Sequence, residues 1–304
     1  MVAKTAKKNE RAARTYAIAG TAFEAPSLAA GLYLVATPIG NLGDITLRAL
    51  ETLARADLIA CEDSRVSRKL LDHYAITTPL TPYHEHNAAE ARPKLLARLA
   101  AGEVVALISD AGTPLVSDPG FKLVREASRE GHGVYAVPGA SSVLSALSVA
   151  ALPTDRFFFE GFLPPKQVAR QKRIAALARI PATLIFFETG PRLSDALADL
   201  AAGLGARDAA ICRELTKLHE EVRRGALASL AGESGETRGE FVIVVSPPQD
   251  DNQTGDVDDL LRQALARVSV KDAVGEVATA TGLSRRDIYQ RALELTKDGD
   301  GETR

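Results

Sequence analysis

The sequence predicts an α/β protein built from two α/β domains and a small C-terminal helical unit. The first observation is that apolar segments of strand length alternate with helical patterns between residues 31 and 152. The second is that a new series of apolar segments begins at residue 153 and continues to residue 248. The third is a polar linker over residues 249–257, which three short helical patterns follow over residues 258–297.

The first 30 residues are predicted to form a flexible basic tail. They carry five basic residues against two acidic ones, and their apolar residues follow no sustained period.

The composition of the whole chain argues against several classes of protein. A formal net charge of -2 does not suit a protein that binds nucleic acids through a positive field over its whole surface, although a local basic groove stays open. Cys61 and Cys212 stand far apart, so their spacing indicates neither a disulfide framework nor a metal site. No apolar stretch reaches the roughly 18 residues that cross a bilayer, and no signal peptide is expected. We therefore expect a cytoplasmic protein.

The first domain is predicted to contain a mostly parallel sheet. Its strands are strongly apolar and are mostly followed by helical patterns, which is typical of a sheet with helices on both faces. A turn is expected through Pro79 and Pro82. The predicted strands cover residues 32–36, 57–63, 104–110 and 134–139, and the predicted helices cover residues 45–56, 66–74, 88–101, 121–129 and 142–150.

A second sheet, whose strands need not all be parallel, is predicted after a hinge at residues 152–155. Its strands are expected at residues 157–163, 183–189, 209–215 and 240–246, with helices at residues 166–179 and 193–203. The C-terminal helices are expected at residues 258–267, 270–281 and 285–297. The break over residues 281–283, with Ser284 as a helix N-cap, has the spacing of a helix-turn-helix unit.

Four strand ends of the first domain carry dense polar or glycine-proline segments. They are TPIGNLGD from residue 37, CEDSR from residue 61, SDAGTPLVSDPG from residue 109 and VPGASS from residue 137. Because the carboxyl ends of parallel strands lie at one edge of a sheet, we expect these segments to converge on a pocket. None matches a dinucleotide fingerprint or a Walker A loop, so the ligand is not expected to be a nucleoside triphosphate. Tight turns that need glycine for their shape are the alternative.

These segments, with LPTDRFFFEGFLPPK and RELTKLHEE further along, resemble the rRNA small-subunit methyltransferase I family of the tetrapyrrole methylase superfamily. The resemblance covers residues 31–246, and the C-terminal helices resemble that family's terminal helix-turn-helix unit. It implies a homodimer of two-domain subunits with S-adenosyl-L-methionine held in a cleft between the domains. The implied reaction is methylation of the ribose 2'-oxygen of a cytidine in 16S rRNA.

The resemblance also implies which residues bind the methyl donor. They lie at two strand ends of the first domain and at two segments of the second: Asp110, Ala111, Gly112, Thr113, Pro114, Pro138, Gly139, Ala140, Ser141, Glu188, Thr189, Leu215 and Thr216. Helix capping is the alternative role for Ser141. The chain departs from many relatives at Pro191, where they carry a histidine just before the arginine that is Arg192 here. A catalytic histidine at that position is therefore excluded.

Methyl transfer to a ribose hydroxyl requires an aligned acceptor oxygen and a group that removes its proton. The catalytic candidates are Glu62, Asp63, His84, Asn87 and Glu214, and Glu85 and His86 share the loop of His84. Ion pairing with Arg65 or Arg68 at a helix N-terminus is the alternative for the two adjacent acids, Glu62 and Asp63.

An RNA substrate requires positive charge, and residues 164–179 carry five basic residues and no acidic one. The residues expected to contact RNA are Gly40, Asn41, Arg65, Lys166, Arg170, Lys172, Arg173, Arg192 and Lys217. A solvated helix face is the alternative for residues 164–179. The last helix adds Arg285, Arg286 and Arg291 within a charge-balanced segment. Two other functions stay open: methylation of a small tetrapyrrole, and non-catalytic binding of nucleic acid.

Overall fold

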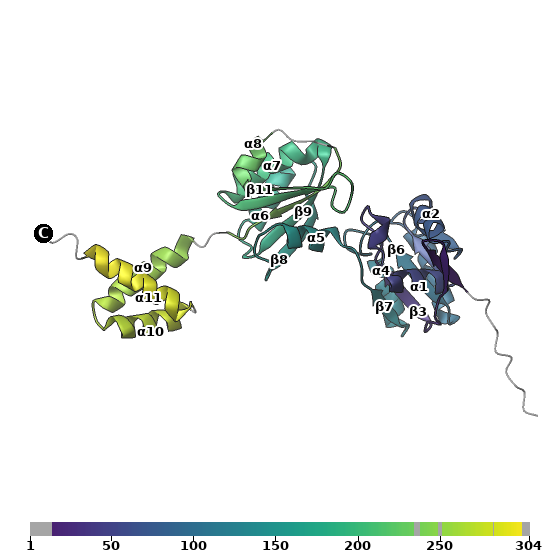
Figure 1. Cartoon of the computed structure of the whole chain (residues 1–304), viewed down its shortest axis with the longest axis horizontal. Coiled ribbons are helices and arrows are strands. Elements are labelled where there is room, and N and C mark those ends of the chain that lie inside the picture. The colour runs from purple at the N-terminus through teal and green to yellow at the C-terminus, as the bar shows by residue number, and fades with distance from the viewer. Residues whose placement is uncertain (1–13, 234–237, 249–250, 282, 300–304) are drawn as a thin grey trace, which may run out of the picture. The chain divides into compact units, whose positions relative to one another are not determined.

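A computed structural model describes residues 14–233, 238–248, 251–281 and 283–299, with side chains in the same ranges except for residues 251–256 and 296–299. The chain divides into two compact units, Met1–Pro247 and Pro248–Arg304 (Figure 1). The first unit contains two five-stranded sheets, and the second contains three helices.

The first sheet is parallel throughout, with the strand order β5-β4-β6-β3-β7. Its strands are β3 (Gly31–Val35), β4 (Leu58–Cys61), β5 (Leu80–Pro82), β6 (Val104–Ile108) and β7 (Val134–Val137). The helices that follow them are α1 (Leu47–Arg55), α2 (Ser64–His73), α3 (Ala88–Ala100), α4 (Phe121–Arg129) and α5 (Ser142–Val149). The predicted parallel sheet is therefore confirmed.

Alternate residues of these strands supply two different cores. Ile59 and Ala106 pack with Leu50 of α1 and Leu71 of α2 on one face. Leu58, Val105 and their neighbours pack with the apolar side chains of α3 and α4 on the other face. Because both faces are covered, nearly every strand position is apolar, and this explains the continuous apolar runs in the sequence.

The strand β5 was expected to be a turn because of Pro79 and Pro82. It pairs only with β4, and Ala60 lies opposite Thr81. Proline has no backbone N–H to donate, but at the end of an edge strand the sheet does not require that hydrogen bond. The fold therefore tolerates Pro82 there.

The second sheet is mixed, with the strand order β11-β10-β12-β9-β8. Its strands are β8 (Phe157–Phe162), β9 (Thr183–Thr189), β10 (Asp208–Arg213), β11 (Glu221–Ala226) and β12 (Glu240–Val245). Only β8 and β9 are parallel neighbours, and the other pairs are antiparallel. One face packs against α6 (Gln167–Leu177), α7 (Gly190–Leu204) and α8 (Leu227–Gly232). The sequence did not predict β11 or α8.

The other face of the second sheet packs against α5, which the sequence assigned to the first domain (Figure 1). Ala146 and Leu147 of α5 share a core with Ile185 of β9 and Val244 of β12. The helix α5 therefore starts at a strand end of the first sheet and covers the second one, so it joins the two sheets.

Part of the predicted N-terminal tail is folded, and that part of the prediction is wrong. The strands β1 (Thr15–Ile18) and β2 (Thr21–Glu24) form an antiparallel hairpin. Tyr16 is buried in the core beside α1, and the guanidinium of Arg14 lies 3.0 Å from a carboxylate oxygen of Asp57. Residues 1–13 lie outside the described residues.

The second unit consists of α9 (Asp251–Leu265), α10 (Val270–Thr281) and α11 (Arg285–Gly299) around a shared core that includes Leu261, Val277 and Ile288. The helix α9 begins seven residues before its predicted start, so most of the predicted linker is helical. The amide of Asp287 donates to the hydroxyl of Ser284, the predicted N-cap, whereas Gly282 of the predicted break lies outside the described residues. No helix in the described part of the chain has both the length and the apolar character to cross a membrane.

Candidate active site

The strand ends of the first sheet meet as predicted. Thr37 and Gly112 exchange two backbone hydrogen bonds of 2.9 and 3.0 Å, which joins the loop after β3 to the loop after β6. The amide of Asp63, just after β4, donates to Oδ1 of Asp110 at 3.0 Å. These bonds fix three of the four loops to one another.

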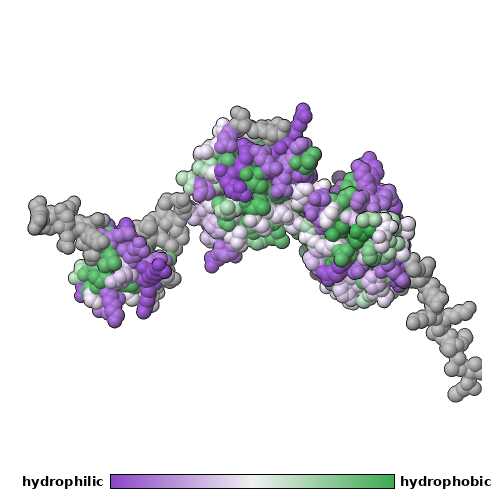
Figure 2. All heavy atoms as spheres, in the orientation of Figure 1, coloured by the Kyte–Doolittle hydropathy of each residue, from purple (hydrophilic) through white to green (hydrophobic). Residues whose placement is uncertain are grey.

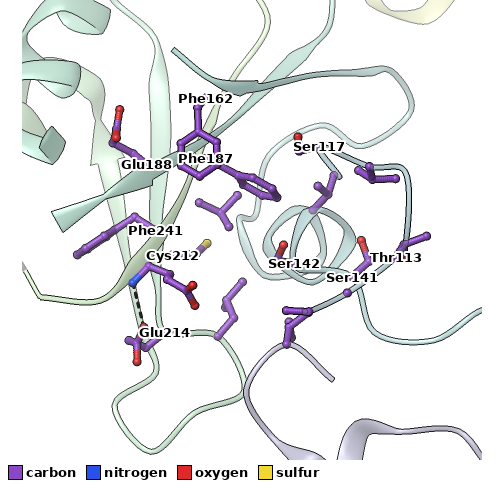
Figure 3. A pocket seen from close by; sticks show the side chains of 18 of the residues that line it. Thr113, Ser117, Ser141, Ser142, Phe162, Phe187, Glu188, Cys212, Glu214 and Phe241 are labelled. Carbon is purple, nitrogen blue, oxygen red and sulfur yellow. Dashed lines mark hydrogen bonds between the residues drawn. The ribbon is translucent and has the colours of Figure 1, made fainter. Parts of the chain in front are cut away.

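A cavity of about 250 Å³ opens beside these loops. Figure 3 shows side chains from the loop after β6 and from the start of α5 on one side, and side chains from β9 and β10 on the other. The cavity therefore lies where the two sheets meet. Seven of the predicted donor-binding residues line it: Ala111, Gly112, Thr113, Ser141, Glu188, Thr189 and Leu215.

The other six predicted donor-binding residues, Asp110, Pro114, Pro138, Gly139, Ala140 and Thr216, lie outside this lining. Asp110 lines an adjacent hollow that also contains Gly40. Gly139, Ala140 and Thr216 line a third hollow at the start of α5. Ser141 lines the main cavity and also caps α5, because its hydroxyl accepts from the amide of Leu144.

The backbone beside the cavity is held in uncommon conformations. Gly112 has a φ of 74°, in the left-handed region that glycine adopts without steric cost. Leu115, Ser117, Glu214 and Thr216 also have positive φ, between 48° and 74°. Non-glycine residues in this region cost free energy and are concentrated at functional sites. Two loops on opposite sides of the cavity are therefore shaped at some cost in stability.

An aromatic wall closes one side of the cavity. The rings of Phe162 and Phe187 pack edge to face with centroids 5.6 Å apart (Figure 3). Phe159 also packs edge to face on Phe187, with centroids 4.8 Å apart. Aromatic faces attract cations and exclude water. This wall suits a positively charged ligand that must be kept from hydrolysis.

Glu188 is a carboxylate at the cavity with a side chain only 1% exposed. One oxygen accepts from the amide of Thr189 at 2.8 Å, and the other lies 3.3 Å from Arg192 without a hydrogen bond among the described residues. Arg192 also donates to the carbonyl of Leu163 at 2.6 Å. Arg192, which was expected to contact RNA, thus pairs with a carboxylate of the cavity and with the backbone beside it.

Lys217, in the loop after β10, reaches across to the turn that follows β3. Its ammonium lies 2.9 Å from Glu214 and 2.6 Å from Glu240, and a Cβ on Gly40 would lie 2.5 Å from its methylene chain. Although burial raises the pKa of Glu214, the amide of Glu240 and the ammonium of Lys217 lower it below its ordinary value. The predicted catalytic Glu214 is therefore held ionised by its neighbours, which makes it a poor proton acceptor.

Another hollow next to the cavity, which we call the acidic hollow, contains several of the catalytic candidates. Glu62, His84, Glu85 and His86 line it together with Asp118, and Ser117 and Asp118 line both hollow and cavity. Burial raises the pKa of Glu62, and the charges of Asp110, Asp118 and Glu85 raise it further. Burial and the charge of Asp110 also raise the pKa of Asp118, although a hydrogen bond with the side chain of Ser109 lowers it in part.

Two other candidates have structural roles. Asp63 caps α2 by accepting from the amide of Arg65, and its carboxylate lies 2.7 Å from that guanidinium. These hydrogen bonds lower the pKa of Asp63 to about 2, so the ion-pair alternative holds for Asp63 and not for Glu62. Asn87 accepts from the amide of His84 and donates to the carbonyl of Pro82, so it shapes the histidine loop.

The predicted RNA-contacting helix is corrected in part. Arg170 is buried, with its guanidinium 2.6 Å from Asp199, so the prediction that it contacts RNA is wrong. Arg173 pairs with Glu160 through two hydrogen bonds. Lys166 and Lys172 are exposed, and Asn41 caps a short helical turn at residues 42–44 with an exposed side chain.

The sequence missed Phe162, Cys212 and Asp118 as lining residues, whereas Phe187 was expected at the strand end beside Glu188. Phe162 and Cys212 lie in strands, where an apolar residue that faces a ligand has the same sequence pattern as one that faces the core. Asp118 lay within a quoted motif, and its acidic side chain after the glycine loop was the available signal. Burial raises the pKa of the Cys212 thiol to about 11, so it is a neutral part of the wall. In the described ranges no three or more histidine, cysteine, aspartate or glutamate side chains are arranged so that they could hold a metal ion.

Residues 31–231 match the model of the tetrapyrrole (corrin/porphyrin) methylases, and residues 251–296 match the model described as RsmI C-terminal HTH domain. A relative from Mesorhizobium japonicum named ribosomal RNA small subunit methyltransferase I is 52% identical over 287 residues, which is 93% of this chain and 97% of the relative. A Pseudomonas aeruginosa protein of the same name is 45% identical over 272 residues, or 86% and 96% of the two chains. The chain belongs to the ribosomal RNA small subunit methyltransferase I family.

This membership confirms the predicted family and the prediction of an S-adenosyl-L-methionine-dependent methyltransferase. Solved structures support the fold. Diphthine synthase aligns with a TM-score of 0.56 at 19% identity, over 71% of this chain and 89% of that one. A cobalt precorrin-4 methyltransferase aligns with a TM-score of 0.53 at 19% identity, over 71% and 94%.

The residues at the cavity fit this methyl donor. The sulfonium and adenine of S-adenosyl-L-methionine need an apolar or aromatic wall, which Phe162, Phe187 and Leu215 provide. Its amino and hydroxyl groups need acceptors, and the second oxygen of Glu188 is buried without a hydrogen-bond partner among the described residues. The left-handed Gly112 keeps the loop backbone open to close approach.

Proposed function

We propose that this protein transfers the methyl group of S-adenosyl-L-methionine to the ribose 2'-oxygen of a cytidine in 16S rRNA. The observation that carries the proposal is likeness over nearly the whole length, C-terminal unit included, to relatives named ribosomal RNA small subunit methyltransferase I. The cavity and the acidic hollow beside it support the same proposal, because they offer adjacent places for a methyl donor and an acceptor.

In this proposal the donor cavity binds S-adenosyl-L-methionine and shields it from water. When bound, S-adenosyl-L-methionine supplies an electrophilic methyl group. Glu188 and the backbone of the Gly112 loop would hold its polar ends, and Phe187 would exclude water from the sulfonium. Arg192 is then a positioning residue, because it fixes Glu188 and the carbonyl of Leu163 without lining the cavity itself.

The acidic hollow would receive the ribose and its proton. During methyl transfer Glu62 would accept the proton that leaves the ribose hydroxyl. A carboxylate with a raised pKa is a stronger base than an ordinary one, and a catalytic base works best when its pKa approaches the working pH. His84 and Asp118 would orient the hydroxyl.

Single substitutions of the acidic hollow test this assignment. We expect Glu62→Gln to lower kcat by about 10²-fold or more while leaving the Kd for S-adenosyl-L-methionine unchanged, since general base catalysis contributes about 10²–10⁴-fold. Labelled-methyl transfer to naked 16S rRNA and to assembled small subunits, at saturating donor, measures the effect. Glu90→Gln, which alters an exposed acid paired with Lys94, is the matched control. Full activity of Glu62→Gln would exclude Glu62 as the base.

The same assay addresses the other functions. Methyl transfer to uroporphyrinogen but not to RNA would indicate a small tetrapyrrole as substrate, and donor binding without any transfer would indicate a non-catalytic protein. The exposed Lys166, at the N-cap of α6, and Lys172, within α6, favour a polyanionic acceptor. A cytoplasmic homodimer is part of the proposal, and light scattering of the purified protein tests its oligomeric state.

A further inference from the structure

A hollow of about 620 Å³ lies between α10 and α11 in the second unit. Lys271 and Gly275 of α10 face Arg285, Arg286 and Tyr289 of α11 across it. The three cations and the tyrosine are exposed. We call this surface the helical-unit groove, and no part of the donor cavity contributes to it.

The cations of this groove differ from the other arginines of the unit in their partners. Arg262 lies 3.0 Å from Asp259, Arg267 lies 3.3 Å from Glu276, and Arg291 lies 2.7 Å from Asp258. Arg291, which the sequence grouped with the two preceding arginines, is therefore committed to α9. Among the side chains described for residues 257–281 and 283–295, the groove cations form no ion pair.

The nearby acids do not neutralise the groove. Asp272 is the one acid in its lining, and its carboxylate accepts from the hydroxyl of Ser269 at 2.7 Å as part of the cap of α10. Asp287 accepts from Ser284 at 2.8 Å in the same way at the start of α11. The lining keeps an excess of positive charge because three cations stand in it against the single carboxylate of Asp272. Figure 2 shows hydrophilic side chains over much of the visible face of this unit.

The groove also offers an aromatic surface and free volume. Tyr289 lies one helical turn after Arg285, on the same face of α11, with 49% of its surface exposed. A Cβ on Gly275 would meet no atom within 4 Å. Cations beside an exposed ring are what RNA with unpaired bases requires, because phosphates pair with the cations and a base stacks on the ring.

We propose that the helical-unit groove is an RNA-binding site in which Lys271, Arg285 and Arg286 contact phosphates and Tyr289 stacks on an unpaired base. The site holds the substrate through contacts that the donor cavity does not make. The inference rests on the proposed function in one respect, that the substrate is RNA.

The test compares two double variants of the full chain. Arg285→Ala with Arg286→Ala removes two unpaired charges, and Arg262→Ala with Arg267→Ala removes two paired charges from the same unit. Binding of a fluorescent 16S rRNA fragment is measured over a range of KCl concentrations. We expect the groove variant to bind at least tenfold more weakly and its salt slope to fall by about 1.4–1.8, since each phosphate contact contributes about 0.7–0.9. The control variant should retain the wild-type slope.

Two further variants separate stacking and shape from charge. Tyr289→Ala should weaken binding about 5- to 150-fold without changing the salt slope, because one stacked base contributes about 1–3 kcal/mol, and Tyr289→Phe should bind like the wild type. Gly275→Gln places a neutral side chain in the free volume and should also weaken binding. Thermal unfolding confirms that the helical unit of each variant is folded, and donor calorimetry confirms that the first unit is intact.

The outcomes distinguish this inference from the proposed function. If the wild type methylates rRNA and the groove variant binds RNA with the affinity and slope of the control, the inference is overturned while the proposed function stands. If the variant binds naked RNA normally but loses methylation of assembled subunits, the groove binds a protein of the particle, which also overturns it. A raised KM for RNA with unchanged kcat supports it. Absence of methyl transfer to RNA by the wild type contradicts the proposed function itself.

Discussion

Glu62 and Asp63 are neighbours in the chain with opposite electrostatic surroundings. Burial and the carboxylates around it raise the pKa of Glu62, whereas hydrogen bonds with Arg65 lower the pKa of Asp63 to about 2. The sequence offered catalysis and ion pairing for both acids without separating them. The separation depends on Asp110 and Asp118, which reach Glu62 only through the folded sheet.

The raised pKa of Glu62 predicts that its charge destabilises the folded protein. The folded state favours the protonated carboxyl, so the stability it contributes is present below the unfolded pKa and is lost as the pH rises through the folded value. We therefore expect Glu62→Gln to raise the Tm at pH 7 and to leave it unchanged below about pH 4, where the wild-type carboxyl is protonated. Thermal unfolding at both pH values measures this. A Tm that falls at pH 7 would show that the charge of Glu62 is stabilised by the fold.

Gly40, in the turn that follows β3, is held in a conformation and a contact that a substitution can test. It has a φ of 144°, and a Cβ there would lie 2.5 Å from the side chain of Lys217. Gly40→Ala should therefore displace Lys217 from Glu214 and Glu240, destabilise the protein by about 1–2 kcal/mol and weaken donor binding. Gly43→Ala in the same turn is the control, since Gly43 has no positive φ. Equal unfolding free energies for the two variants would contradict this role.

At the scale of elements, the sequence predicted the buried strands well and the edges poorly. The central strands β3, β4 and β6 are apolar on both faces, so each appears in the sequence as a continuous apolar run between polar segments. The edge strand β11 has the sequence EVRRGA, which contains no continuous apolar run, so the pattern indicated no strand there. The packing of α5 on the second sheet could not be predicted, because it joins segments that are distant in the sequence.

Contacts between distant segments also explain why the prediction for α6 was partly wrong. Its run of basic residues resembled one solvated face, but Arg170 turns inward to Asp199, which lies on α7. Sequence spacing predicts which residues lie on one side of a helix. It does not predict that a buried acid on another helix pairs with one of them. Lys166 and Lys172 are exposed, as are Arg179 and Arg173, and Arg173 pairs with Glu160.

Because Arg170 is buried and Lys166 and Lys172 are exposed, their substitutions should have different effects. Arg170→Ala leaves the carboxylate of Asp199 buried without its cation, so it should cost about 3–5 kcal/mol of unfolding free energy, although Gln171 also donates to Asp199. Lys166→Ala with Lys172→Ala should leave stability within about 0.5 kcal/mol and reduce the salt slope of RNA binding. Denaturant unfolding and RNA titration measure the two effects. An Arg170→Ala variant as stable as the wild type would contradict the assigned role of the pair.

At the scale of the whole molecule, the two compact units have separate hydrophobic cores. The donor cavity takes its lining from both sheets of the first unit, and α5 joins those sheets, so donor binding should stabilise them together. The second unit has its own core around Leu261, and the helical-unit groove lies on it. Donor binding and RNA binding through the groove therefore depend on different cores.

This separation predicts two thermal transitions in the full chain. S-adenosyl-L-methionine at about 100 times its Kd should stabilise the first unit by about 2.7 kcal/mol and raise the Tm of one transition only. Leu261→Ala, which removes a fully buried side chain of the second unit, should lower the Tm of the other transition. Differential scanning calorimetry of wild type and variant, with and without donor, measures both shifts. A single transition that responds to the donor and to Leu261→Ala alike would show that the two cores unfold as one, because only a shared transition can be moved from both units.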